Sequence, residues 1–331
     1  MASFKKVAGG WQAQVAIKGT REAKTCSTKA EAVAWASERE TQLRRMAETG
    51  VDTDKTCQDA FNRYIKEVSA HKRGQKFETL RLNAIANHKL GKQTFGATPL
   101  HAVTSDMLGT WRDERLKSVS GSTVNREFNL LSHVFTTARR EWKWIAASPT
   151  TDVRRPKESP PRDRLISADE VDKITFVSGF AETPAKSVQE RVGVAFHFAL
   201  ETAMRAGEIC GLTAGDITGS VAHLGDTKNG TSRDVPLSTR AIQLLGYLPA
   251  QKRGQPSFGL TSAQLDANFR KIRDMAGVED LTFHDTRHEA ITRLAKKLNV
   301  LELARMVGHK DIRMLQVYYN ETANEIAKKL A

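Results

Sequence analysis

Residues 281–288 read Leu-Thr-Phe-His-Asp-Thr-Arg-His and open a helix whose apolar side continues through Leu294. The three-residue interval places His284 and Arg287 on one face of that helix. His284 and His288 lie four residues apart, a spacing that could hold zinc. The glutamate expected between such histidines is absent, however, and no third ligand is evident. The stretch therefore predicts a helix that presents hydrogen-bond donors, and no metal site.

A second segment follows at residues 303–312, Leu-Ala-Arg-Met-Val-Gly-His-Lys-Asp-Ile. It predicts a helix, a glycine-assisted turn that exposes His309, and a new helix that leads to Tyr318 and Tyr319. Paired tyrosines beyond an apolar helix could simply pack in a core. Their place in a chain whose Arg and His side chains are directed at one region favours a chemical role for one of them.

A third segment, residues 201–212, reads Glu-Thr-Ala-Met-Arg-Ala-Gly-Glu-Ile-Cys-Gly-Leu. Arg205 begins a short helix, and Glu208 follows one turn later and can support it. Taken alone, this spacing is better explained as a surface ion pair worth a few tenths of a kcal/mol. Together, the three segments are a strong signal for a catalytic site.

These residues resemble the tyrosine recombinase (phage integrase) family, whose pattern is an Arg with a Glu three residues later, a hairpin Lys, His-x-x-Arg, Gly-His and a Tyr nine residues beyond that histidine. The matching residues, in order, are Arg205 with Glu208, Lys228, His284 with Arg287, His309, and Tyr318. The chain departs from the pattern at Ala203, where Gly is usual, at Glu289, where a small hydroxyl residue is common, and at Tyr319-Asn320, where a residue plus His is usual. The nine-residue interval selects Tyr318 over Tyr319 as the nucleophile.

The resemblance implies DNA strand cleavage and rejoining through a covalent 3′-phosphotyrosine, without cofactor or metal. Arg205 and Arg287 would neutralise the phosphate, because guanidiniums are permanently charged bidentate donors. His309 would bond a phosphate oxygen, Lys228 would protonate the leaving oxygen and His284 would manage the tyrosine proton.

The charge balance agrees with a nucleic-acid partner. The chain has 331 residues and a formal charge of +13, which attracts phosphate backbones, although a soluble basic protein without such a role could carry the same charge. The three cysteines are far apart and lack metal or disulfide spacing. Because the chain has neither an apolar run of membrane-spanning length nor a signal-like start, we expect a cytoplasmic protein of a bacterial host.

The apolar periodicity predicts a mainly α protein with small β-sheets, in the α+β class. Residues 1–50 form a small sheet plus a helix and resemble arm-type DNA-binding domains. Residues 51–148 form a helical bundle that resembles the family's core-binding domain. Residues 149–164 form a basic, proline-rich linker, and residues 165–331 form the mixed helical catalytic domain with a short sheet. In that domain the pattern predicts a helix over 187–203 and strands at 221–224 and 234–237, which flank a hairpin turn that contains Asn229-Gly230.

The partners that the resemblance implies are double-stranded DNA at attachment sites, three further copies of the chain in a tetramer, and DNA-bending accessory proteins. The amino-terminal sheet favours an integrase of a phage or mobile element. Two alternatives remain: a type IB topoisomerase with the same chemistry, and a non-catalytic DNA-binding regulator, for which the residue series would be a coincidence.

Overall fold

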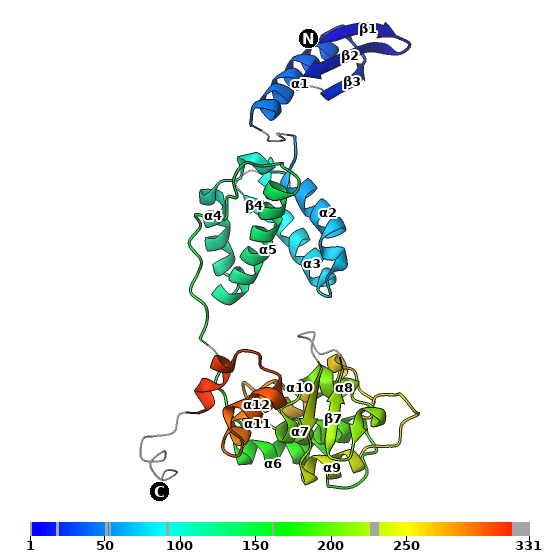
Figure 1. Cartoon of the computed structure of the whole chain (residues 1–331), viewed down its shortest axis with the longest axis vertical. Helices are drawn as coiled ribbons and strands as arrows, with labels where there is room; N and C mark the ends of the chain where they lie inside the picture. Colours follow the sequence, from blue (N-terminus) through cyan, green and yellow to red (C-terminus); the bar gives the residue numbers. More distant parts are fainter. Residues whose placement is uncertain are drawn as a thin grey trace. The chain divides into compact units, whose positions relative to one another are not determined.

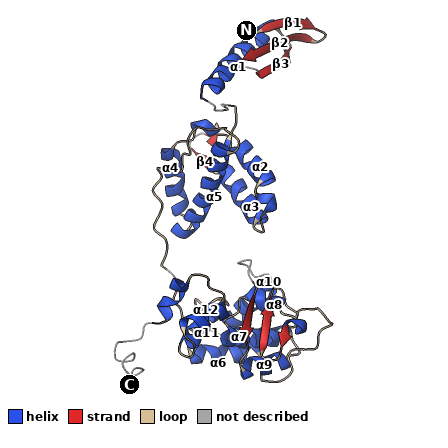
Figure 2. Ribbon diagram, viewed as in Figure 1, coloured by secondary structure: helices blue, strands red, loops and turns tan. Residues whose placement is uncertain are grey.

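The computed structural model describes residues 2–17, 20–49, 52, 54–90, 93–160, 162–225 and 232–319. The chain divides into two compact units, Met1–Pro161 and Arg162–Ala331. Both are mainly helical, and their sheets are small and antiparallel (Figures 1 and 2). The fold confirms the predicted α+β class. None of the described helices is long and apolar enough to cross a membrane.

The first unit begins with a three-stranded sheet of order β1-β2-β3, covered by one helix (Figure 1). The elements are β1 (Ser3–Val7), β2 (Gly10–Ile17), β3 (Thr20–Cys26) and α1 (Lys29–Thr49). Alternate residues of β2, among them Ala13 and Val15, pack against Ala32 and Ala36 of α1 in a small core. Gly10 has a φ of 150°, and a Cβ there would lie 2.1 Å from the Cys26 carbonyl oxygen, so the hairpin requires glycine.

A helical bundle with its own core completes the first unit. Its main elements are α2 (Cys57–Glu67), α3 (Gln75–Ala86), α4 (Ser105–Leu116) and α5 (Gly121–Arg140), with a two-stranded hairpin of β4 (Lys89–Leu90) and β5 (Gln93–Thr94). Side chains of Thr56, Thr104 and Ser120 cap three of the helices. Trp111 of α4 is fully buried, with its ring centroid 5.2 Å from that of Phe128. The large aromatic residues therefore form the centre of this bundle.

The basic, proline-rich segment follows α5 and packs along it. The Asn125 amide donates to the Pro156 carbonyl at 3.0 Å, and the Ser159 amide donates to the Ser122 hydroxyl at 3.0 Å. A Cβ at Gly121 would lie 2.2 Å from the Lys157 carbonyl oxygen, so this close approach requires glycine. Residues 156–159 of the predicted linker are thus attached to the bundle, because their backbone groups form hydrogen bonds with side chains of α5.

The second unit is built around a buried central helix, α7 (Val188–Thr202), which packs most extensively against four other helices. Those helices are α6 (Ala168–Ser178), α9 (Thr239–Gly246), α10 (Ser262–Met275) and α11 (Asp285–Ala295). The remaining elements are α8 (Ala206–Gly211), a sheet of β6 (Ile217–Thr218), β7 (Val221–Leu224) and β8 (Arg233–Pro236), then α12 (Val300–Val307) and the 3-10 helix η4 (Ile312–Tyr318). The helix predicted to lead to Tyr318 is therefore a 3-10 turn. The predicted hairpin turn at residues 226–231 lies outside the described residues.

The start of the second unit is bound to one face of α11. Arg162 donates to both carboxylate oxygens of Asp285, at 2.7 and 2.9 Å, and to Asp280 at 2.9 Å. The Ile166 amide donates to Glu289 at 3.1 Å. Asp285 and Glu289 are one turn apart, so they share a face of α11 that is different from the face of His284, Arg287 and His288. These contacts hold the helix that carries the central motif.

Candidate active site

Arg205 lies in the loop between α7 and α8, where the backbone turns sharply. Ala203 caps α7 in the left-handed conformation, with φ 53°. This conformation is the physical reason for glycine at this position in the family, and an alanine adopts it at a cost of about 1–2 kcal/mol. The turn places Arg205 at the start of α8, where its Nη1 donates to Glu208 Oε1 at 2.9 Å.

Glu208 is bound by a second arginine, Arg233 of β8. Arg233 donates to the two Glu208 oxygens at 2.9 and 2.7 Å, and its Nε donates to the Met306 carbonyl at 3.0 Å. Burial would raise the pKa of Glu208, but the hydrogen bonds from Arg233 and Arg205 outweigh it and hold the pKa at about 2. The carboxylate therefore stays ionised. Through Arg233 it connects the turn at Arg205 to the end of α12.

Arg287 of α11 is buried and donates to backbone carbonyls on two sides. Its Nη1 bonds the Ala203 carbonyl, and its Nη2 bonds the Val307 carbonyl at 2.7 Å. Burial, followed by the charge of Arg205, lowers the pKa of Arg287 to about 10, so the guanidinium remains cationic at neutral pH. Arg287 thus links the Arg205 turn to the turn after α12.

His309 follows Gly308, which caps α12 with a φ of 71°. Its Nε2 lies 3.3 Å from Arg287 Nη2. Because a guanidinium only donates, Nε2 accepts, and the neutral ring carries its proton on Nδ1. Burial, then Arg287, Arg205 and Arg233, lower the pKa of His309 to about 4. Among the described residues the buried Nδ1 has no hydrogen-bond partner, so it is a donor available to a ligand.

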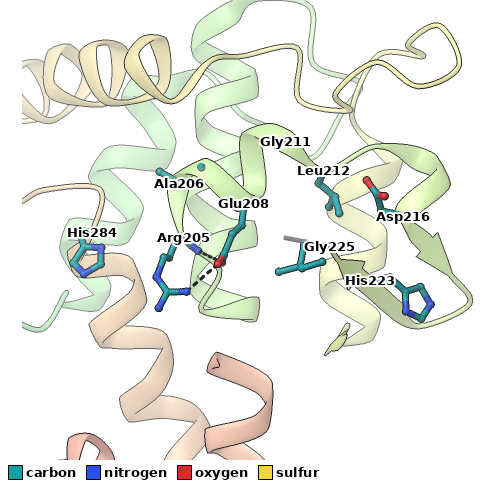
Figure 3. A pocket seen from close by; sticks show the side chains of 11 residues that line it. Arg205, Ala206, Glu208, Gly211, Leu212, Asp216, His223, Gly225 and His284 are labelled. Atoms are coloured by element: carbon teal, nitrogen blue, oxygen red, sulfur yellow. Dashed lines mark hydrogen bonds and ion pairs between the residues drawn. The ribbon is translucent and has the colours of Figure 1, made fainter. Parts of the chain in front are cut away.

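His284 is exposed at the first residue before α11 and faces a cavity of about 700 Å³. Arg205 and Glu208 line the same cavity, which extends to His223 and Gly225 beside the sheet (Figure 3). In the close-up, the Arg205 guanidinium lies between His284 and Glu208. Arg205 is therefore the cation that lines this cavity, and the carboxylates of Glu208 and Asp216 line it as well.

Tyr318 and Tyr319 have different hydroxyl partners. The Tyr318 hydroxyl lies 2.8 Å from His288 Nδ1, and burial raises the pKa of Tyr318 while Arg287 opposes that rise. The Tyr319 hydroxyl donates to the Leu298 carbonyl at 2.8 Å, a contact that ties it to the chain before α12. Of these two tyrosines, Tyr318 is the one whose hydroxyl has a titratable hydrogen-bond partner among the described residues.

Three guanidiniums, those of Arg205, Arg233 and Arg287, surround one carboxylate, Glu208, and lower the pKa of a neighbouring histidine. Such an excess of positive charge, with a buried N–H beside it, suits an anion such as a phosphodiester. A tyrosine hydroxyl held on the same helix as Arg287 is a suitable nucleophile for that anion.

Comparison with known proteins agrees with this chemistry. The profile of the phage integrase family matches residues 165–325. A putative integrase/recombinase of Haemophilus influenzae is 37% identical over 300 residues, covering 89% of this chain and 96% of the relative. The chain belongs to the tyrosine recombinases of the phage integrase family. It is therefore a site-specific recombinase, and family membership implies the covalent phosphotyrosine intermediate.

Two further similarities extend over most of the recombinase. A shufflon-specific DNA recombinase of Escherichia coli is 38% identical over 283 residues, which are 82% of this chain and 70% of the relative. The crystal structure of a lambda integrase tetramer bound to a Holliday junction superposes with a TM-score of 0.65 at 19% identity, covering 94% of this chain and 92% of that one. At 19% identity, the similarity to lambda integrase is a similarity of fold.

Of the predicted site residues, Arg205, Glu208, Arg287 and His309 form one connected network, and His284 shares the cavity with Arg205 and Glu208. Tyr318 is close enough to Arg287 to oppose, to a small extent, the lowering of the Arg287 pKa by burial. The predicted lysine, Lys228, lies outside the described residues. Among the residues that the structure describes, no group of three or more His, Cys, Asp or Glu could hold a metal ion.

Two residues of the site, His288 and Arg233, are not among the predicted site residues. The sequence relates His288 only to His284, by a spacing that could hold zinc, whereas in the structure it bonds the Tyr318 hydroxyl. Arg233 begins the strand after the hairpin turn and matches no residue of the family pattern. The sequence does contain an indication for Arg233. Side chains alternate along a strand, so Arg233 points to the same side as buried Val235, and a buried arginine requires an anionic partner.

Proposed function

We propose that Arg205, Arg287 and His309 bind the phosphodiester that the recombinase cleaves, and that Tyr318 is its nucleophile. The observation that carries this proposal is the connected cluster of Arg287, His309 and the Arg205–Glu208 pair, with the Tyr318 hydroxyl bonded to the helix of Arg287. The guanidiniums neutralise the non-bridging oxygens, and Nδ1–H of His309 donates to one of them.

The reaction follows from these positions. The Tyr318 oxygen forms a bond to phosphorus while the bond from phosphorus to the 5′ oxygen breaks, which leaves a 3′-phosphotyrosine and a 5′-hydroxyl. Lys228 protonates the leaving oxygen, and His284, to which the resemblance gives the tyrosine proton, lies at the cavity that Arg205 also lines. A 5′-hydroxyl of a second strand reverses the step, so the phosphodiester energy is conserved.

The position of the Arg205 guanidinium depends on supporting residues. Glu208 receives hydrogen bonds from both Arg205 and Arg233, while Arg233 also bonds the backbone of α12 two residues before Gly308. We therefore assign Glu208 and Arg233 to positioning: they set the distance between the Arg205 turn and the His309 turn, and neither contacts the phosphate.

The proposed partner is double-stranded DNA at attachment sites, bound by four copies of the chain. The formal charge of +13 and the fold shared with a lambda integrase tetramer bound to a Holliday junction support it. Contacts made mainly to phosphates release counterions, so DNA affinity should fall steeply with salt. Residues 1–50 are proposed to bind separate arm sites, 51–148 to bind the core site, 149–164 to link the two units and 165–331 to carry catalysis. DNA-bending accessory proteins remain a prediction, as does action in the bacterial cytoplasm.

Covalent capture tests the nucleophile. The full chain is incubated with a library of nicked duplexes whose core sequence is randomised, and adducts that survive denaturation are isolated and sequenced. The nick lets the cleaved 5′ fragment diffuse away, so the adduct accumulates. We expect adducts on one short sequence with the native chain and with Tyr319→Phe, and none with Tyr318→Phe.

Three results would contradict the proposal. Adducts that persist in Tyr318→Phe and vanish in Tyr319→Phe would move the nucleophile by one residue. Adducts on unrelated sequences, together with relaxation of any supercoiled plasmid, would indicate the swivelling chemistry of a type IB topoisomerase. Unchanged function of Tyr318→Phe would indicate a regulator.

A further inference from the structure

His288 is the described residue that contacts the Tyr318 hydroxyl. Its Nδ1 lies 2.8 Å from the hydroxyl oxygen, and the two ring centroids are 5.2 Å apart at an interplanar angle of 53°. The rings therefore meet obliquely, with the hydroxyl directed at a nitrogen. Both side chains are half-buried, which limits competition from solvent water for this hydrogen bond.

The position of His288 on α11 relates the tyrosine to the phosphate-binding group. His288 directly follows Arg287, and both lie on the helix face that begins at His284. A neighbouring face of the helix is held by Arg162 on Asp285 and by the Ile166 amide on Glu289. A helix fixed in this way keeps the hydroxyl partner and the Arg287 guanidinium at a set separation.

Tyr319 supplies an internal comparison for this contact. Its hydroxyl bonds the Leu298 carbonyl, which accepts a hydrogen bond but cannot take a proton at neutral pH. The partner of Tyr318 is an imidazole, which can do both. Burial raises the pKa of Tyr318, so a neutral phenol needs a base when it attacks phosphorus.

We infer that His288 is the general base of the cleavage step, which aims the Tyr318 hydroxyl and takes its proton. This inference rests on Tyr318 being the nucleophile. As the bond from Tyr318 oxygen to phosphorus forms, the phenolic proton passes to Nδ1 of His288. The bond from phosphorus to the 5′ oxygen breaks, and that oxygen receives a separate proton from Lys228. In the reverse step both protons return.

Substitutions of His288 separate aiming from packing. In His288→Asn, the side-chain amide oxygen lies at about the position of the imidazole Nδ1. In His288→Gln, it lies at about the position of Nε2. The measurement is the single-turnover rate of adduct formation at saturating protein on the captured, nicked substrate. General-base catalysis contributes on the order of 10²–10⁴-fold, so we expect His288→Leu to lose about a hundredfold or more. His288→Asn should lose less than His288→Gln, because only Asn preserves the hydrogen bond.

A sulfur-substituted substrate assigns the defect to one end of the reaction. When sulfur replaces the bridging 5′ oxygen, the leaving thiolate needs no proton. Lys228→Ala should then regain most of its rate, whereas His288→Leu should remain slow, because its defect lies at the attacking oxygen. Tyr319→Phe is the matched control and should cleave both substrates at the native rate.

Several outcomes would overturn the inference: a native rate in His288→Leu, a faster rate, recovery of His288→Leu on the sulfur substrate, or equal rates for Asn and Gln. The Asn and Gln pair decides if the Leu variant does not fold. Failure of the nucleophile assignment is recognised separately, because Tyr318→Phe would then still form adducts in the same assay.

Discussion

Two buried glutamates, one in each unit of the recombinase, are each held by a pair of arginines. Glu127 of α5 receives hydrogen bonds from Arg115 at 2.8 and 3.0 Å and from Arg81 at 3.3 Å. Glu208 receives similar bonds from Arg233 and Arg205. Their side chains are 3% and 10% exposed. By local geometry the two clusters are alike.

The clusters differ in what surrounds them. The hydrogen bond to Glu127 raises the pKa of Arg115, as expected for a satisfied ion pair. Beside Glu208, burial and the neighbouring arginines lower the pKa of Arg287, and a neutral histidine presents a buried donor that has no partner among the described residues. An arginine–glutamate pair therefore indicates an anion-binding site where neighbouring buried donors give the cluster more positive charge than its carboxylate neutralises.

The largest expected difference between the clusters is in catalysis. Arg287→Lys replaces a planar donor that makes three fixed contacts by a single ammonium, so adduct formation should fall by about a hundred- to thousandfold. Arg115→Lys is the matched control and should leave the single-turnover rate on saturated DNA unchanged. If Arg287→Lys cleaved within tenfold of the native rate, the site would not need the bidentate geometry.

Neutralising each glutamate sharpens the comparison. Glu208→Gln and Glu127→Gln each weaken charge-assisted hydrogen bonds, and each should lower the free energy of unfolding by about 1–3 kcal/mol in urea titrations. Only Glu208→Gln should also slow adduct formation, because Arg205 and Arg233 then repel each other across residue 208 and Arg205 is displaced. Equal effects of the two variants on cleavage would remove the distinction.

The contacts on the Asp285 face of α11 should have a smaller effect. Asp285 is nearly fully buried and bonds Arg162 and the Thr282 amide, so Asp285→Asn should lower the free energy of unfolding by about 1–2 kcal/mol. Asp280→Asn, at an exposed carboxylate bound by the same arginine, should cost less. A larger loss in Asp280→Asn than in Asp285→Asn would contradict this account of how α11 is held.

The last expected effect is a pH dependence of stability. An unfolded histidine binds a proton near pH 6.5, whereas His309 in the folded chain binds one only near pH 4. Between these values the unfolded state holds more protons, so this contribution to stability is lost as pH falls. His309→Gln should flatten the difference between urea titrations at pH 6.5 and pH 4, relative to the native chain. A variant with an unchanged slope would place the titration elsewhere.

Much of the second unit follows from local patterns. The apolar period predicts a helix over 187–203, and α7 spans Val188–Thr202. Strand β7 has the predicted bounds, and β8 is displaced by one residue from the predicted 234–237. Helical spacing relates His284 to Arg287 and His288 because 3.6 residues make a turn. It does not indicate which other segment each side chain meets.

The kind of chemistry can be predicted from the chain alone, because Arg205, Arg287, His309 and Tyr318 occur at intervals that identify the family. The network between these residues becomes visible in the folded protein. Arg233 reaches Glu208 across 25 positions of sequence, and His288 reaches Tyr318 across 30. Such pairings depend on how helices and strands pack, and periodicity within one element carries no information about packing between distant elements.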